Sequence, residues 1–374
     1  MRRIEWVLLL AMVAGGCARP VAEQADVVVV EKSSKVTAFA DVVERIELVP
    51  LETGPAFLLG TCPSLDLDAD GYVLTDSRTG RVLYFGQDGA FRAHIGTRGR
   101  GPGEYPMLLN SQVDADGNIV VFSYPDKVMY FGTDGELIRE EHPDELGTQC
   151  FLVPEGLLIY FGFGSVVPDR AVLRRADGSQ KGFLTTDANV INMTPGTPVF
   201  STFDGTVYFT DTYNPTVYSY KDGTVKEAVT FDFGKSAIVD KFFHTADPYA
   251  GTDLILKAPN GFSLIRRYVR NARYQFLESI LQRNDQSEIH YGLAVDGVWD
   301  WFSLGDLASS PFAGSMQVLD GNCLYFLLNT EALASKDNGL GGNLEPLRAL
   351  IANPEVLDRV TVDDNPVVAK FFLK

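Results

Sequence analysis

Two stretches of this 374-residue chain share one pattern. The first is "LDLDADGYVLTDSRTGRVLYFGQDGAF", Leu65–Phe91, and the second is "SQVDADGNIVVFSYPDKVMYFGTDGEL", Ser111–Leu137. Each contains Asp-Ala-Asp-Gly, an apolar run, a polar turn, a second apolar run that ends in Tyr-Phe-Gly, and a final Asp-Gly. Corresponding residues of the two copies, such as Gly71 and Gly117, are 46 positions apart. A repeat of this length indicates an architecture built from small, similar units.

Weaker copies continue the repeat toward the C-terminus. Four more turn glycines follow at increasing intervals and bring the number of units to six: Gly156, Gly205, Gly261 and Gly321. Asp-Gly and Asn-Gly pairs favour type I′ hairpin turns, and the β-branched and aromatic residues around them favour strands. A single four-stranded sheet cannot bury both of its faces, but six stacked around an axis can. We therefore predict an all-β fold, a six-bladed β-propeller of four-stranded antiparallel blades.

The ends of the predicted propeller also have strand character. Residues Glu44–Thr53 precede the first full unit, and Asn365–Lys374 end the chain. We predict that these two segments share one blade, so that strands from both termini close the ring with hydrogen bonds. Residues 344–352 have helical spacing of leucines and predict a short surface helix. Arg266–Arg283 fits either a helix or a hairpin with its turn near Asn271, and the blade count favours the hairpin.

The N-terminus has the pattern of an export signal. "MRRIEWVLLLAMVAGGC" has two arginines, an apolar run too short to cross a bilayer, and small residues before Cys17. We predict a signal peptide over 1–16 and lipidation of Cys17, with an ordinary signal peptide and a chance cysteine as the alternative. Residues 17–35 are then a lipid-anchored flexible tether, and residues 36–374 form the propeller.

Composition excludes one class of function. The chain carries a net charge of −17 and no cluster of Lys or Arg, which argues against nucleic acid as a partner. Cys62, Cys150 and Cys323 form no Cys-x-x-Cys pair, so a zinc knuckle is not expected. Buried thiols are favoured, although an envelope location would also permit a disulfide.

Several motifs resemble those of the six-bladed β-propeller lipoproteins of Bacteroidetes, a family similar in pattern to NHL-repeat propellers. The resemblance covers almost the whole chain after Cys17 and is carried by these segments in addition to the paired Asp-Ala-Asp-Gly units: "ELVPLET" (Glu47–Thr53), "GTRGRGPGEY" (Gly96–Tyr105), "YFGTDGEL" (Tyr130–Leu137) and "DDNPVVAKFFLK" (Asp363–Lys374). It implies the propeller fold and a cell-envelope location, lipid-anchored and facing the periplasm, with surface exposure as the alternative. It implies little about activity, because function depends on a site and not on a fold.

The glycine-rich stretch Gly96–Pro106 is the first candidate site. A phosphate-binding loop opens a helix, whereas here Pro102 and Pro106 flank Gly-Glu-Tyr and a β repeat follows. We interpret this stretch as the connection from the rim of the first unit to the axis of the second. Glu104 is expected to accept backbone N–H groups or to pair with an arginine. In the functional alternative, Arg98, Arg100 and Tyr105 line the mouth of the central channel and contact a carboxylate or phosphate.

Trp299 and Trp301 are the second candidate site. Paired tryptophans near Asp300 can stack on a sugar ring or contact a peptide, but they can equally be core residues. We keep both interpretations open.

The remaining motifs argue against catalysis. His94 and His142 fall late in their units, on outer strands, and His244 and His290 lie in segments that match the repeat loosely, so we predict no axial metal. Asp68, Asp70, Asp114 and Asp116 suit turns better than calcium. No nucleophile or zinc-protease motif is present, and no cofactor is expected. The sequence therefore favours a non-catalytic ligand- or protein-binding lipoprotein. The alternatives are a metal-dependent lyase or hydrolase in the axial channel and an accessory of an outer-membrane nutrient-uptake complex.

Overall fold

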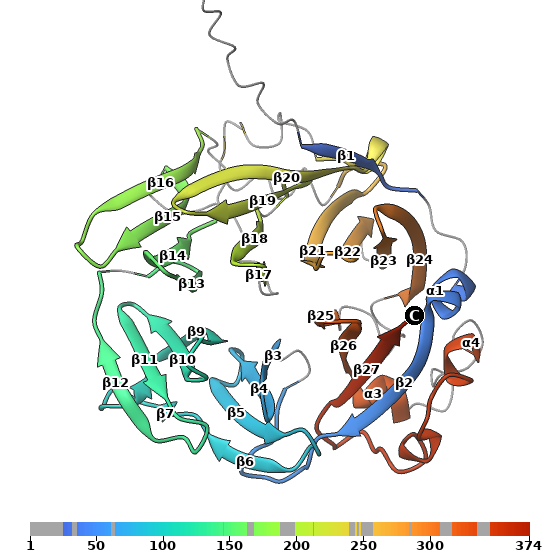
Figure 1. Cartoon of the computed structure of the whole chain (residues 1–374), viewed down its shortest axis with the longest axis horizontal. Coiled ribbons are helices and arrows are strands. Elements are labelled where there is room, and N and C mark those ends of the chain that lie inside the picture. Colours follow the sequence, from blue (N-terminus) through green and yellow to red (C-terminus); the bar gives the residue numbers. More distant parts are fainter. Residues whose placement is uncertain are drawn as a thin grey trace, which may run out of the picture.

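The structure is a six-bladed β-propeller, as the repeat predicts (Figure 1). It is a computed structural model that describes residues 25–31, 36–60, 64–144, 146–162, 168–187, 199–211, 213–238, 244, 247, 257–283, 286–306, 316–334 and 345–374. Hydrophobic clusters lie between neighbouring blades. The cluster between the first two, for example, joins Val73 and Tyr84 to Val121 and Met129. This is how sheets that cannot bury their faces alone acquire a core.

Each of the first five blades is continuous in sequence, with its first strand nearest the axis and its fourth at the rim. Blade 1 contains β3 (Ser64–Asp68), β4 (Gly71–Asp76), β5 (Arg81–Gly86) and β6 (Phe91–His94). Blade 2 contains β9 (Met107–Val113), β10 (Ile119–Tyr124), β11 (Lys127–Phe131) and β12 (Leu137–Glu141). Blade 3 contains β13 (Gln149–Val153), β14 (Gly156–Tyr160), β15 (Asp169–Arg175) and β16 (Gln180–Thr185). Blade 4 contains β17 (Phe200–Phe203), β18 (Thr206–Thr210), β19 (Thr216–Lys221) and β20 (Thr224–Asp232), and blade 5 contains β21 (Phe262–Arg270), β22 (Tyr274–Arg283), β23 (Gln286–Val295) and β24 (Val298–Asp306).

Blade 6 closes the ring with strands from both ends of the chain, as predicted. It consists of β25 (Met316–Asp320), β26 (Cys323–Leu328), β27 (Val367–Leu373) and β2 (Val43–Pro50). The outer pair is antiparallel, from Val43 opposite Leu373 to Pro50 opposite Val367. Short helices accompany this blade: α3 (Thr330–Ala334), α4 (Glu345–Arg348) and the 3-10 turn η4 (Pro354–Val356).

Asn365 ties the two termini together beside this seam. Its side chain is 1% exposed. The amide oxygen accepts the Leu59 N–H (2.8 Å), and the amide nitrogen donates to the carbonyls of Glu52 (2.7 Å) and Phe57 (3.1 Å). The Asp-Asn-Pro motif that precedes β27 thus fixes the chain that enters blade 1, over more than 300 residues of sequence separation.

A second set of hydrogen bonds joins the innermost strands of all six blades. In each case a side chain on the innermost strand of one blade bonds to the backbone in, or directly next to, the innermost strand of the next blade. The bonds join the Asp66 carboxylate to the Val113 N–H (2.9 Å), the Gln112 amide oxygen to the Leu152 N–H (2.8 Å), the Gln149 amide oxygen to the Val199 N–H (2.8 Å), the Ser201 hydroxyl to the Tyr268 carbonyl (2.7 Å), the Arg267 guanidinium to the Gln317 carbonyl (3.0 Å) and the Gln317 amide oxygen to the Leu65 N–H (3.3 Å). We call this set the axial ring. Each bond contributes about 0.5–1.5 kcal/mol.

The N-terminal region is more ordered than the sequence suggests. Residues 26–29, within the segment 17–35 predicted as a flexible tether, form β1 (Asp26–Val29), which pairs in parallel with β20. A helix, α1 (Val36–Val42), then precedes β2, and its Phe39 stacks on Phe302 of β24 with ring centroids 4.4 Å apart. β1, α1 and β2 follow the outer rim across blades 4, 5 and 6 (Figure 1). The apolar residues of this region (Val28, Val30, Phe39) have core partners that local sequence does not reveal.

The turns differ partly from the prediction. Type I′ geometry, with positive φ at both turn residues, occurs at Asp204-Gly205, Asp222-Gly223 and Asp296-Gly297. At Asp116-Gly117 only the glycine has positive φ, because the turn is one residue wider: Gly117 N–H donates to the Asp114 carbonyl, and Asp114 N–H donates to the Asn118 carbonyl.

Two further expectations are refined by the structure. Arg266–Arg283 forms a hairpin with its turn at Asn271, as the blade count favoured. Asn260-Gly261, however, precedes β21 and is not the turn between the two inner strands of blade 5. The helix predicted over 344–352 is shorter, and it is not purely a surface helix, since Leu347 is fully buried in the core cluster of blades 5 and 6.

We predict that Asn365→Ala destabilises the protein by about 2–4 kcal/mol, because it leaves one buried N–H and two partly buried carbonyls without their partner. Urea unfolding followed by tryptophan fluorescence measures this loss. Asn260→Ala, at an exposed turn position, is the matched control and should change the free energy of unfolding by less than about 0.5 kcal/mol. Equal stability of the two variants would contradict the role assigned to Asn365.

Candidate functional site

The loop Gly96–Pro106 leads from β6, at the rim of blade 1, to β9, nearest the axis in blade 2, as the sequence predicted. It contains a small parallel pair, β7 (Thr97–Arg98) and β8 (Glu104–Tyr105). The Glu104 carboxylate turns back into the loop and accepts the backbone N–H groups of Arg100 and Gly101, both at 2.8 Å. Position 99 must be glycine, because a Cβ there would collide with this carboxylate.

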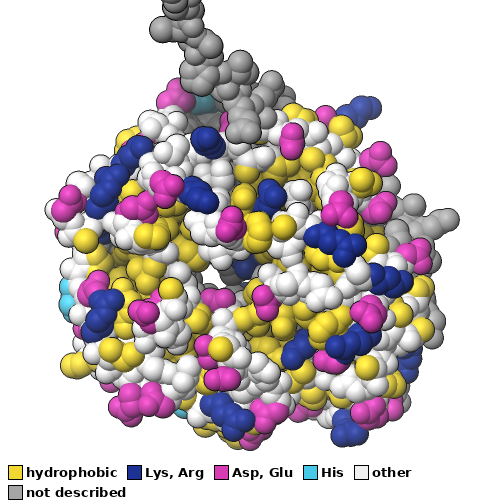
Figure 2. All heavy atoms as spheres, viewed as in Figure 1, with side chains coloured by type: hydrophobic (Ala, Val, Ile, Leu, Met, Phe, Trp, Pro, Cys, Tyr) yellow, Lys and Arg dark blue, Asp and Glu magenta, His cyan; other side chains and the backbone are white. Residues whose placement is uncertain are grey.

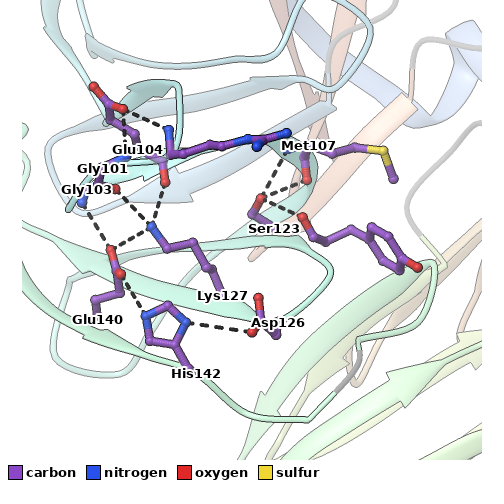
Figure 3. A network of polar contacts seen from close by, with 11 residues as sticks. Gly101, Gly103, Glu104, Met107, Ser123, Asp126, Lys127, Glu140 and His142 are labelled. Carbon is purple, nitrogen blue, oxygen red and sulfur yellow. Dashed lines mark hydrogen bonds and ion pairs between the residues drawn. The ribbon is translucent and has the colours of Figure 1, made fainter.

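The same loop is anchored from below by a buried ion pair on blade 2 (Figure 3). Lys127, whose side chain is 8% exposed, donates to the carbonyls of Gly101 (3.0 Å) and Glu104 (2.8 Å) and pairs with Glu140 (3.0 Å). Glu140 in turn accepts the Gly103 N–H at 3.1 Å. Burial raises the pKa of Glu140, but the hydrogen bonds from Lys127 and Gly103 outweigh burial and hold this pKa below its usual value.

Arg98 and Arg100 lie on this anchored loop, and both are exposed. Glu104 does not pair with either guanidinium, because its carboxylate is engaged by backbone N–H groups. Among the residues that the structure describes, neither guanidinium has a hydrogen bond or an ion pair. The loop therefore presents two cationic groups on a fixed backbone.

Tyr105 does not line a channel mouth, which corrects the sequence prediction. It is 1% exposed and packs in the core cluster between blades 1 and 2. Its hydroxyl donates to the Ile95 carbonyl (3.3 Å) and accepts the Val82 N–H (3.3 Å), and burial raises its pKa to about 12. The aromatic ring faces inward because β8 pairs with β7, and this pairing is not visible in the local sequence.

Trp299 and Trp301 lie on β24, the outer strand of blade 5. Their rings stack on each other with centroids 5.5 Å apart, and Trp299 meets Phe231 of β20 edge-on at 5.4 Å. Both are half-buried and belong to the cluster between blades 4 and 5, together with Val28 of β1. Of the two interpretations of this pair, the structure favours a core role. β24 and β7 lie on opposite sides of the ring, so the two candidate sites are not brought together (Figure 1).

The propeller axis is open on the face shown in Figure 2, where acidic and basic side chains are interspersed. Polar side chains on the innermost strands form the axial ring. Burial raises the pKa of Asp66, although N–H groups of Val113 and Leu67 oppose this, and burial lowers the pKa of Arg267 to about 10. Sequence analysis missed this ring. A signal existed, since Asp66 and Gln112 both stand five residues before the turn glycine of their repeats.

The histidines and cysteines do not converge. His94 ends β6 and His142 directly follows β12, which confirms their predicted place on outer strands, while His290 lies on β23. Within the described ranges, no group of three or more His, Cys, Asp or Glu side chains is placed to hold a metal ion. Cys150 and Cys323 are buried free thiols, as expected, whereas Cys62 and Cys17 lie outside the described residues. None of the helices described is long and apolar enough to span a membrane.

Comparison with known proteins identifies a family and a fold. Residues 23–371 match the model of the family described as Domain of unknown function (DUF4934). No curated protein matches the chain. A solved structure from Bacteroides fragilis, described as an exported protein, superposes with a TM-score of 0.73 at 17% identity, covering 94% of this chain and 100% of that one.

Two other solved structures superpose less closely. A protein of unknown function from Bacteroides caccae has a TM-score of 0.38 at 11% identity, covering 66% of this chain and 81% of that one. BamB from Moraxella catarrhalis has a TM-score of 0.35 at 8% identity, covering 87% and 98%.

We predict that Glu104→Ala loosens the loop without unfolding the propeller, because two backbone N–H groups lose their acceptor while the Lys127–Glu140 pair remains. Trypsin should then cleave after Arg98 or Arg100 several-fold faster than in the unchanged protein, as measured by mass spectrometry of the fragments. Glu136→Ala, on an exposed turn of blade 2, is the control and should leave cleavage unchanged. An unaltered rate in Glu104→Ala would show that this carboxylate does not hold the loop.

Proposed function

The chain belongs to the DUF4934 family, and from this membership and its geometry we propose that it is an exported, lipid-anchored propeller that binds an anionic ligand and performs no chemistry on it. The observation that carries the proposal is the pair of exposed guanidiniums, Arg98 and Arg100, on a loop whose backbone is held by Glu104 and Lys127.

A loop whose backbone conformation is already fixed favours binding, because the ligand does not have to order it. A flexible loop would lose conformational entropy on binding, whereas this loop has already lost it in folding. Guanidinium groups prefer carboxylate and phosphate oxygens, which they can contact with two parallel hydrogen bonds. In a protein with a net charge of −17, two neighbouring cations without acidic partners are an unusual local feature.

The use of the axis supports a role without chemistry. Axial channels are where propeller enzymes could place reactive groups, but here Asp66, Gln112, Arg267 and Gln317 bond to the backbone of the next blade. A group that holds neighbouring blades together cannot also move protons or bind a substrate without weakening the ring.

The location is supported by the sequence and by one relative. The N-terminal segment has the charge and apolar pattern of a signal peptide and ends at Cys17, the proposed site of lipidation. The similar structure from Bacteroides fragilis is of a protein described as exported. Two acyl chains on Cys17 would give stable anchoring, whereas one chain alone gives only marginal binding.

Ligand binding is tested by affinity gel electrophoresis with polygalacturonate as the carboxylate probe and polyphosphate as the phosphate probe. We expect retardation in at least one of these gels and none in neutral dextran. Arg98→Gln with Arg100→Gln should weaken binding roughly tenfold or more, because each lost charged hydrogen bond costs about 1.5–3 kcal/mol.

Arg359→Gln, at an exposed position near η4, is the control and should migrate as the unchanged protein does. Because the protein is strongly acidic, nonspecific attraction to polyanions is weak. Free migration in both anionic gels would therefore contradict the proposed binding site.

Anchoring is tested separately by Cys17→Ala in a bacterial host that processes lipoproteins. We expect the unchanged protein to sediment with membranes and the variant to move to the soluble envelope fraction. An unchanged distribution would show that Cys17 is not the anchor.

A further inference from the structure

β1 fixes where the N-terminal chain joins the propeller. It pairs with the last strand of blade 4 from Asp26 opposite Val229 to Val29 opposite Asp232, and the Val30 N–H donates to the Asp232 carbonyl at 3.0 Å. Because side chains alternate along a strand, Val28 and Val30 turn inward and pack beside Phe231, Trp299 and Trp301. The attachment point is therefore on the outer rim, away from the axis and from the loop Gly96–Pro106 (Figure 1).

The outward side of this attachment point is apolar. Val27 is 64% exposed and Val29 is 62% exposed. These two residues, Val27 and Val29, are the rim patch. They are among the most exposed large apolar side chains that the structure describes.

We propose that the rim patch lies against the lipid surface, so that the propeller stands on its edge with its axis parallel to the membrane. This inference rests on the proposed lipidation of Cys17. Only eight residues, 18–25, separate Cys17 from Asp26, and even a fully extended chain of that length spans about 30 Å. A tether this short keeps the rim of blades 4 and 5 next to the bilayer.

A lipid surface is a better occupant for the patch than a second copy of the chain. The patch is flanked by Asp26 and Glu31, both exposed, so edge-to-edge pairing of two β1 strands would bring carboxylates together. Each copy also carries a net charge of −17. In contrast, an uncharged interfacial layer can accept two valines beside an acyl anchor.

The edge-on orientation has a functional consequence. β7, which carries Arg98, and β1 lie on opposite sides of the ring (Figure 1). The loop that carries Arg98 and Arg100 would then lie on the side away from the membrane, and neither flat face of the propeller would rest on the bilayer. A propeller anchored through one of its flat faces would instead lose one mouth to the bilayer.

The test uses the lipidated, full-length mature protein with Cys62→Ser as the background, since Cys150 and Cys323 are buried. A fluorophore is attached to a single cysteine introduced as Val27→Cys, Val29→Cys or Ile138→Cys. Ile138 is the matched control, an apolar residue 56% exposed on β12 of blade 2. Quenching is measured on neutral phosphatidylcholine vesicles that contain headgroup spin-labelled lipid.

We expect the two rim labels to be quenched at least threefold more strongly than the Ile138 label. Inserting thirty Gly and Ser residues after Gln24 should keep the protein on the vesicles but reduce this ratio. Equal quenching of all labels, or stronger quenching at Ile138, would overturn the orientation while leaving the anchor intact.

Two other outcomes also count against the proposal. If the protein with Cys17 does not bind vesicles at all, the lipid anchor fails and the orientation fails with it. If light scattering shows a dimer that Val27→Lys converts to a monomer, the rim patch is an interface between two copies and not a lipid contact.

Discussion

A polar side chain on each innermost strand of this propeller bonds to the backbone of the next blade, and six such bonds return to their starting point. The rest of the structure depends on this closure. Blades have no core of their own, because their apolar side chains are buried only against neighbours. An open ring would expose one face of the first blade and one of the last.

Closure also explains how the termini are arranged. β2 and β27 come from opposite ends of the chain and complete one blade, and Asn365 holds the connection that follows β2 in place. The N-terminal region also attaches to the outside of the ring, where β1 pairs with blade 4 and α1 packs on blade 5. The part of the chain that is proposed to meet the membrane thus precedes, in sequence, the strand that closes the ring.

These hydrogen bonds and packing contacts determine which side chains are engaged within the fold and which are left exposed. Polar groups at the axis are committed to holding blades together, and the tryptophans of β24 are committed to the cluster between blades 4 and 5. The loop between blades 1 and 2 is different, because its own backbone is satisfied by Glu104 and Lys127 and its arginines are left exposed. The proposed binding site is therefore a connection whose backbone the fold holds in place, while its arginine side chains stay exposed.

The sequence by itself determined the blade count, the four strands per blade and the shared closing blade, because hairpin turns and alternating apolar residues act over a few neighbouring positions. It also determined the course of the Gly96–Pro106 loop. Only the tertiary structure decided that Tyr105 points into the core, that Leu347 is buried, and that residues 26–29 become a fifth strand on blade 4. Each of these outcomes depends on a partner far away in the chain, and the local sequence pattern does not identify that partner. The axial ring lies between the two cases: Asp66 and Gln112 recur at one position of the repeat, but the backbone partners of the ring exist only once the six blades surround one axis.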